Sequence, residues 1–246
     1  GTMAPLTPQS LGDMDVLFLS DSGVRSLRVS DSSNNALVVD IGTPIDPIIQ
    51  AHLATLSAAE QAAACAVVDP TSNRYWLFLP KAGGGEGTIY VLSYYPSAGI
   101  SAWSTYRPTY DVNGTQTAFT PLKFEVHEGV IYARCSNKLV RFDPADYDAC
   151  GMTMETPWLD GQAPATRKMF KALDAAMEGT WTCSFGADYI GGTLQPVVVE
   201  TQSTFQFNAY RMNHRGTHFK LQAVESGSAY ARFSNFAVHY QPADAR

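Results

Sequence analysis

Two histidines are spaced like the ligands of a metal site. His214 and His218 would present two nitrogen atoms to one metal ion if the segment between them were a helix. Arg215 and Gly216 predict a turn there instead, and no third ligand accompanies the pair. The remaining histidines are isolated in the sequence: His52, His127 and His239. We therefore expect no metal site.

Glycines cluster in a short segment that superficially resembles a phosphate-binding loop, Gly83-Gly84-Gly85-Glu86-Gly87. Phosphate loops end in Gly-Lys-Ser/Thr and lead into a helix, whereas this segment leads into an apolar, strand-like run. The pattern favours a hairpin loop. A Gly-x-Ser-x-Gly nucleophile elbow does not occur either, so we expect no catalytic residue and no bound cofactor.

Acidic side chains gather near the middle of the chain. They are Asp143, Asp146 and Asp148, followed by Glu155 and Asp160. Two carboxylates can act as the acid and the base of a glycosidase, and acidic residues are also common in turns. The sequence leaves both explanations open and favours turns.

Three aromatic side chains are a second feature that is typical of glycan-binding proteins. Trp103, Tyr94 and Tyr106 are candidates for stacking on sugar rings, which present flat apolar faces. Packing between neighbouring strands explains the same residues without a ligand.

The composition favours many short strands around a sizeable core. Of the 246 residues, 45% are apolar and 11% aromatic, which suffices for one large β domain or two smaller ones. Charged residues make up only 16%, while 19 glycines and 14 prolines supply turns. The predicted fold class is all-β.

The charge balance argues against tight DNA binding. With 23 acidic and 17 basic residues, the chain carries a formal charge of −6 and lacks the basic surface of a protein that grips phosphates. An acidic surface can still lie beside DNA, because repulsion lets the polyanion slide past. Neither a signal peptide nor a membrane span is indicated, so we expect synthesis in the cytoplasm.

The cysteines are scattered without a Cys-x-x-Cys pair, which predicts reduced structural thiols. They are Cys65, Cys135, Cys150 and Cys183.

Short apolar runs between turn residues predict strands through the first half of the chain. The expected strands are 15–20, 24–29, 36–41, 66–69, 74–79, 88–95, 101–106, 119–126, 130–135 and 138–142. Asp46 as an N-cap and Pro47 predict the start of a helix, and Ser57 with Glu60 forms a capping box for another. We expect a helical insertion near residues 47–65, within strands spaced like those of propeller blades.

Longer, alternating strands predict a second domain. Large residues fall on one face of 180–185, and the same period of two recurs around Phe207, Phe219 and Phe236. Residues 167–178 have helical propensity, but they adjoin Gly179 and an alternating partner, which favours a strand. We expect partial β-propeller-like blades in residues 1–152 and a small β-sandwich domain in residues 153–246.

Several short sequence segments together form a distinctive pattern along the chain. They are DVLFLSDSGVRSL (15–27), AVVDP (66–70), RYWLF (74–78), IYVL (89–92), AWS (102–104), LVRFD (139–143), ETPWLD (155–160) and EGTW (178–181). The first five resemble blades of the tail-nozzle, or packaged-DNA-stabilisation, proteins of short-tailed, podovirus-like bacteriophages. The last three resemble the segment that leaves the propeller in that family, and residues 218–240 resemble the final strands of its sandwich domain.

The resemblance implies a non-enzymatic structural protein of a bacteriophage or prophage virion tail. Such a nozzle lies below the portal, retains packaged DNA and conducts it during DNA ejection. The implied partners are further copies in a ring, the portal, adaptor or other tail proteins, and passing DNA without tight or sequence-specific binding.

The first half offers about three blades, whereas a closed propeller needs at least about four, so open sheet edges are expected. The alternative function is a carbohydrate-binding or glycan-cleaving phage tail protein, with Trp103, Tyr94 and Tyr106 as its glycan-stacking residues.

Overall fold

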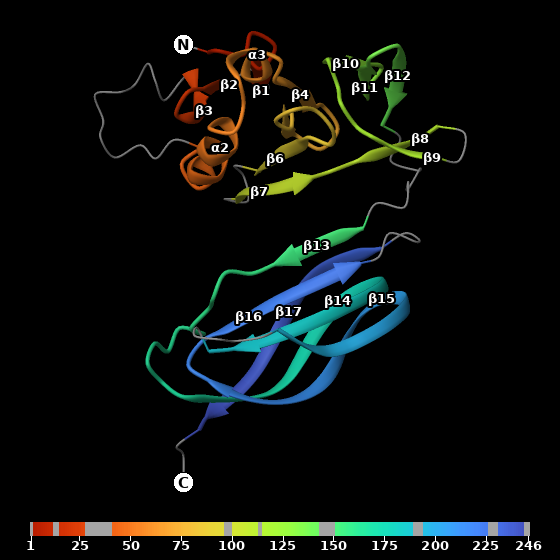
Figure 1. The fold of residues 1–246 in the computed structure, drawn as a ribbon. Coiled ribbons are helices and arrows are strands. Elements are labelled where there is room, and N and C mark those ends of the chain that lie inside the picture. The colour runs from red at the N-terminus through yellow and green to blue at the C-terminus, as the bar shows by residue number, and fades with distance from the viewer. Residues whose placement is uncertain are drawn as a thin grey trace. The chain divides into compact units, whose positions relative to one another are not determined.

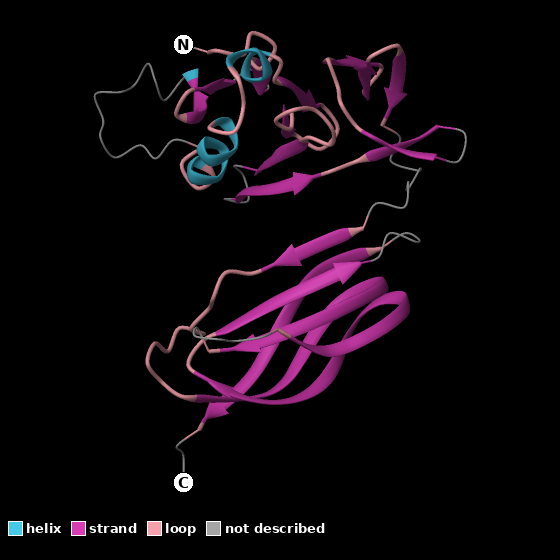
Figure 2. Cartoon of the chain, viewed as in Figure 1, coloured by secondary structure: helices cyan, strands magenta, loops and turns pink. Residues whose placement is uncertain are grey.

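The structure, a computed structural model, describes residues 2–11, 15–27, 41–95, 100–112, 115–142, 151–188, 194–225 and 231–243. The chain forms two compact units, residues 1–146 and 147–246. The sequence prediction placed the boundary after residue 152. Strands dominate the described residues, so the all-β class is confirmed (Figures 1 and 2). None of the described helices is long and apolar enough to cross a membrane.

The first unit contains three larger antiparallel sheets and one small hairpin (Figure 1). The first sheet consists of β1 (Gln9–Leu11), β2 (Asp15–Ser20) and β3 (Gly23–Ser26). The second consists of β4 (Cys65–Asp69), β5 (Arg74–Leu79), β6 (Thr88–Tyr95) and β7 (Ile100–Tyr106). The hairpin is β8 (Thr109–Val112) with β9 (Thr115–Ala118), and the third sheet is β10 (Lys123–His127), β11 (Val130–Cys135) and β12 (Lys138–Arg141).

Strand β5, a central strand of sheet β4–β7, is buried on both faces. On one face Leu77 packs in a core that includes Leu19 of β2 and Ile49 of a helix. On the other face Phe78 packs in a second core with Phe119. Because neither face of β5 meets water from Tyr75 to Leu79, this strand is an almost uninterrupted apolar run instead of an alternation of apolar and polar residues. Three successive meanders are thus stacked through two cores, and among the described strands no sheet closes on itself.

The two helices lie in the predicted insertion. Helix α2 spans Asp46–Leu53 with Pro47 in its first turn, and α3 spans Ala58–Ala62. The predicted capping box is confirmed, since the Ser57 backbone N–H donates to Glu60 Oε2 (2.8 Å) and Ser57 Oγ accepts from the Glu60 N–H.

The predicted N-cap of α2 is wrong. Asp46 is the first helical residue, and Ile45 occupies the N-cap position without a side-chain hydrogen bond. The Asp46 carboxylate is instead held by Arg25, which explains why it does not cap the helix.

The second unit is a single five-stranded sheet that folds over on itself. It contains β13 (Met152–Glu155), β14 (Lys168–Ala187), β15 (Gln195–Gly216), β16 (Phe219–Glu225) and β17 (Arg232–Pro242). Strand β14 pairs with β15 along one edge, and along its other edge with β17 and then β16. The strand assignment of residues 167–178, made against helical propensity, is confirmed from Lys168 onward.

Contacts between the ends of β14 reveal the fold-over. The rings of Phe170 and Phe185 lie 5.2 Å apart, whereas a straight strand would separate them by roughly 50 Å. The bend falls near Gly179, which has a φ of +94°, and the pairing shifts register on either side of it. The core that was expected between two sheets of a sandwich therefore lies between two halves of one bent sheet.

Some sequence predictions fall outside the described residues. These are most of the predicted strand 36–41, the acidic residues Asp143, Asp146 and Asp148, and Cys150.

Candidate functional site

The three candidate glycan-stacking residues lie on two faces of sheet β4–β7. Tyr94 and Trp103 pack against the core on one face, where Trp103 Nε1 donates to the Ile41 carbonyl oxygen (3.0 Å). Tyr106 packs on the other face, edge to face with Trp76 at 5.6 Å between ring centroids. The structure brings Tyr94 and Trp103 together but separates both from Tyr106, so the three rings do not form one stacking platform.

The acidic residues that the structure describes serve local structure. Glu155 accepts hydrogen bonds from Lys220 and from Gln222 Nε2 across strands β13 and β16. The hydrogen bond from Lys220 lowers the pKa of Glu155. Asp160 Oδ1 accepts from the Gln162 backbone N–H (2.9 Å) in a turn. These two carboxylates have the contacts expected of structural and turn residues.

The spaced histidines do not form a pair. His214 lies in β15 against the Phe185 ring (5.4 Å), whereas His218 shares a hydrogen bond with Thr217 Oγ1 (2.9 Å). Within the described ranges, no group of three or more His, Cys, Asp or Glu side chains is placed to hold a metal ion. Cys65, Cys135 and Cys183 are free and buried thiols.

The glycine-rich segment is a hairpin loop between β5 and β6, as predicted. The Gly83 backbone N–H donates to Glu60 Oε1 (2.8 Å), which ties the loop to α3. The Gly83 amide therefore has a partner within the chain.

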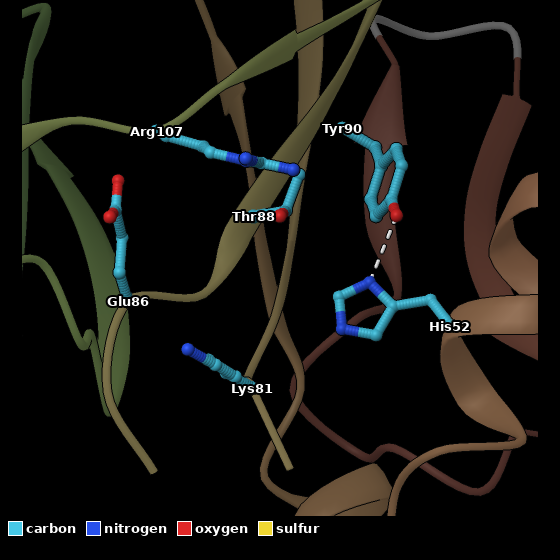
Figure 3. Close-up of a pocket in the computed structure, with 6 residues that line it drawn as sticks. All are labelled: His52, Lys81, Glu86, Thr88, Tyr90 and Arg107. Atoms are coloured by element: carbon cyan, nitrogen blue, oxygen red, sulfur yellow. Dashed lines mark hydrogen bonds between the residues drawn. The ribbon is translucent and has the colours of Figure 1, made fainter.

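A polar pocket of about 320 Å³ lies beside this loop (Figure 3). It is lined by His52, Lys81, Glu86, Thr88, Tyr90 and Arg107. Lys81 follows the end of β5, Thr88 begins β6, and Arg107 follows the end of β7. These three strands are neighbours in antiparallel order. The last residues of β5, the first of β6 and the last of β7 therefore lie side by side at the same end of the sheet.

The floor of the pocket is fixed by hydrogen bonds. His52 Nε2 lies 2.9 Å from the Pro80 carbonyl oxygen, and His52 Nδ1 lies 2.9 Å from the Tyr90 hydroxyl. A carbonyl oxygen only accepts, so Nε2 is assigned the proton, and in the neutral ring Nδ1 accepts from the Tyr90 hydroxyl. Burial raises the pKa of Tyr90, and the positive charge of Arg107 opposes that shift.

The charged residues surround the opening. Lys81, Glu86 and Arg107 are exposed, whereas Thr88 and Tyr90 are buried at 8% and 4% exposure. Within the part of the chain that the structure describes, Lys81 and Arg107 make no ion pair and no side-chain hydrogen bond. Figure 3 shows the ends of both cations reaching toward the space that the pocket residues enclose.

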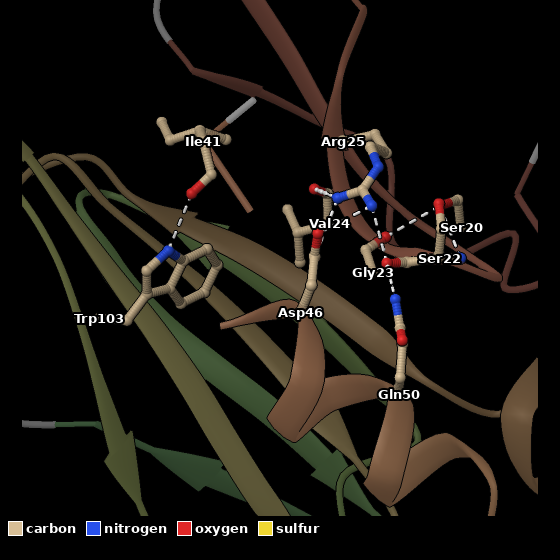
Figure 4. A network of polar contacts seen from close by, with 9 residues as sticks. All are labelled: Ser20, Ser22, Gly23, Val24, Arg25, Ile41, Asp46, Gln50 and Trp103. Carbon is tan, nitrogen blue, oxygen red and sulfur yellow. Dashed lines mark hydrogen bonds and ion pairs between the residues drawn. The ribbon is translucent and has the colours of Figure 1, made fainter. Parts of the chain in front are cut away.

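A polar network holds α2, and with it His52, against the first sheet (Figure 4). Arg25 donates to both carboxylate oxygens of Asp46, each at 2.9 Å, and also to the Ser22 and Val24 carbonyl oxygens. Gln50 Nε2 donates to the same Ser22 oxygen (2.8 Å). The bidentate geometry fixes the helix direction as well as its position.

Sequence reasoning missed the pocket. His52 is isolated in the sequence, and neither Lys81 nor Arg107 belongs to a motif. The one available signal is the position of Lys81 next to the glycine-rich segment, and this signal does not indicate which side chains of other strands lie beside it.

No known protein family model matches the chain, and no curated protein matches it. Among solved structures, the chain is similar to part of a structure of the Gt strain of infectious bursal disease virus. That match has 15% identity and a TM-score of 0.24, over 64% of this chain and 40% of the viral chain. The chain is also similar to an exo-β-1,3-galactanase from Phanerochaete chrysosporium, in one structure with 12% identity and a TM-score of 0.20, over 92% of this chain and 65% of the galactanase. A second structure of that enzyme, with galactose, matches at 11% identity and a TM-score of 0.21, again over 92% of this chain and 65% of the galactanase. At such low TM-scores these similarities do not identify a fold or a function.

Proposed function

We propose that this chain is a structural protein of a bacteriophage or prophage tail, which acts as part of a nozzle below the portal. In this role the protein works through its surfaces and not through a catalytic centre. Copies assemble in a ring in the host cytoplasm, join portal, adaptor or other tail proteins, and let DNA pass without gripping it.

The observation that carries the proposal is the order of the sheets along the chain. Three successive antiparallel meanders are stacked through two cores, and a separate unit of long strands follows them. This order agrees with the blade-then-sandwich order implied by the short strings that resemble tail-nozzle proteins. The formal charge of −6 agrees with a surface past which DNA slides.

Open strand edges support assembly with other chains. Among the described strands, the 11-residue β17 pairs only with β14, so no described strand pairs with its other edge. Edge strands and exposed apolar side chains are common places for contact with another chain. Leu139 in the edge strand β12 is 70% exposed, and Leu122 before β10 is 51% exposed.

The rival glycan-binding role has less support from the geometry. It depends on Trp103, Tyr94 and Tyr106 acting together, and these side chains lie on two faces of their sheet.

The test is the mass of the chain in solution, from light scattering after gel filtration, together with negative-stain images. We expect rings of one defined size, formed by the chain alone or with a portal. Leu139→Glu should reduce assembly without unfolding the chain, while Thr115→Glu adds the same charge at an exposed polar position of β9 and should leave assembly unchanged. A monomer at all concentrations that also fails to join portal assemblies would contradict the proposal.

A further inference from the structure

The pocket beside the glycine-rich loop gathers positive charge in a chain that is acidic overall. Lys81 and Arg107 line it together with a single carboxylate, Glu86, although acidic residues outnumber basic ones by 23 to 17 in the whole chain. Elsewhere in the described residues, cations such as Arg25 and Lys220 lie against carboxylates. Lys81 and Arg107 make no such pair in the described structure, so their charges are available to a ligand.

The pocket also supplies neutral hydrogen-bonding groups at its floor. The Thr88 hydroxyl faces the pocket and makes no hydrogen bond with any residue that the structure describes. The Tyr90 hydroxyl is held in place by His52 Nδ1. A lysine, an arginine and a hydroxyl that converge from three neighbouring strands present donors to several oxygen atoms of one anion.

We propose that this pocket binds the phosphate group of a small molecule, either inorganic phosphate or a phosphate monoester. Arg107 would contact two phosphate oxygens through its planar guanidinium, Lys81 would neutralise charge from the opposite side, and Thr88 would donate from the floor. The volume of about 320 Å³ lies at the small end of the range for ligand pockets, which suits a small phosphate compound better than a polymer. This site is independent of the proposed tail function.

The first experiment is calorimetric titration of the full chain with inorganic phosphate and with a nucleoside monophosphate. Arg107→Ala and Lys81→Ala should each weaken binding about tenfold, since each removes a charge-assisted contact. Arg134→Ala and Lys171→Ala are matched controls, because both are exposed cations on other strands, outside the pocket. The affinity of these two control variants for phosphate should equal that of the unmodified chain.

A variant that binds phosphate more tightly is a stronger test than one that binds it less tightly, because a misfolded variant also loses affinity. Glu86 is exposed in the loop, so Glu86→Gln should fold normally while it removes the one negative charge of the pocket. We expect phosphate to bind about threefold to tenfold more tightly to this variant, because a like charge near the ligand is removed.

Two results would overturn the proposal. One is the lack of any heat of binding at millimolar phosphate, or binding that is equal in all the variants. The other is binding of a single-stranded oligonucleotide in place of inorganic phosphate, with the same dependence on Arg107, which would mean that the groove follows a nucleic acid backbone.

Discussion

At the scale of single residues, position 87 has room only for glycine. A Cβ atom added to Gly87 would lie 2.4 Å from the Phe78 ring and 2.6 Å from the Leu79 carbonyl oxygen. Phe78 is 3% exposed in the second core of the first unit, so its ring cannot move away without disturbing its neighbours.

Gly87→Ala should therefore lower the free energy of unfolding by about 1–3 kcal/mol, as expected for overpacking. Urea unfolding followed by circular dichroism measures the change. Ala82→Ser, in the same loop and at an exposed position, is the control and should stay within about 0.5 kcal/mol of the original chain. An equal stability of the two variants would show that the loop shifts to admit the methyl group.

Buried thiols make stability depend on pH at the alkaline end. Burial raises the pKa of Cys65 from an ordinary value of 9.0 to about 12, with a smaller contribution from Cys135, and burial raises the pKa of Cys183 to about 11. Each thiol thus holds its proton more tightly in the folded chain than in the unfolded one. The stabilisation is fully present below pH 9 and is lost as the pH rises toward the folded pKa, by up to about 1.4 kcal/mol per thiol and pH unit.

Cys183→Ala should make the slope of unfolding free energy between pH 9 and pH 11 less steep. The measurement is urea unfolding at a series of pH values, and the matched comparison is the same series at pH 6 to 8, where the slopes of the two chains should agree. Unchanged slopes above pH 9 would mean that the thiol is accessible to water in the folded chain.

At the scale of elements, one ion pair attaches helix α2 to the hairpin of β2 and β3. Arg25 and Asp46 have side chains that are only 20% and 15% exposed, and two hydrogen bonds join them. A partly buried, bidentate pair of this kind contributes more than a surface pair.

Asp46→Asn should lower the free energy of unfolding of the first unit by about 1–3 kcal/mol, because Arg25 keeps its charge and loses its partner. The control is Glu125→Gln, which removes an equally short pair with Lys123 at 59% and 68% exposure and should cost less than about 1 kcal/mol. Hydrogen exchange of the α2 amides is the second readout. Equal effects of the two substitutions would contradict the assigned role of the network.

The elements follow from the sequence wherever local chemistry and burial agree. Ser57 and Glu60 define the start of α3 because the capping box is a contact within one turn. Strand β5 could be predicted because Arg74–Leu79 is both apolar and rich in β-forming side chains. The role of Asp46 could not be predicted in this way, because its partner Arg25 lies in a different element and no local pattern indicates it.

The pocket could not be predicted for a related reason. Lys81, Thr88 and Arg107 come together through the pairing of three strands, and pairing becomes visible only when the register is known. The bend in β14 could not be predicted either. The alternation of apolar and polar residues indicates which side chains share a face of the strand, but it does not indicate how far a long strand curves. Gly179 is a local signal for the bend, because glycine adopts the positive φ found there, but a glycine alone does not distinguish a bend from a turn.

At the scale of the whole molecule, the cores of the two units have none of the described residues in common. The clusters of the first unit contain no residue beyond Phe142, and those of the second begin at Met154. Each unit should therefore unfold through its own core. Trp181 is the best probe of the second unit, since it is fully buried, packs edge to face on Phe233 at 5.2 Å and donates from Nε1 to the Glu178 carbonyl oxygen.

Trp181→Ala should destabilise the second unit by about 3–5 kcal/mol and leave the first unit almost unchanged, because the described contacts of Trp181 lie within residues 147–246. The converse substitution is Leu77→Ala, at a fully buried position in the first unit. It should lower the free energy of unfolding of the first unit by about 2–5 kcal/mol and leave that of the second unit unchanged. Hydrogen exchange read by mass spectrometry on the full chain separates the two, since peptides from each unit report independently. If either substitution removes protection from both units together, the chain unfolds as one cooperative body, which would contradict this prediction.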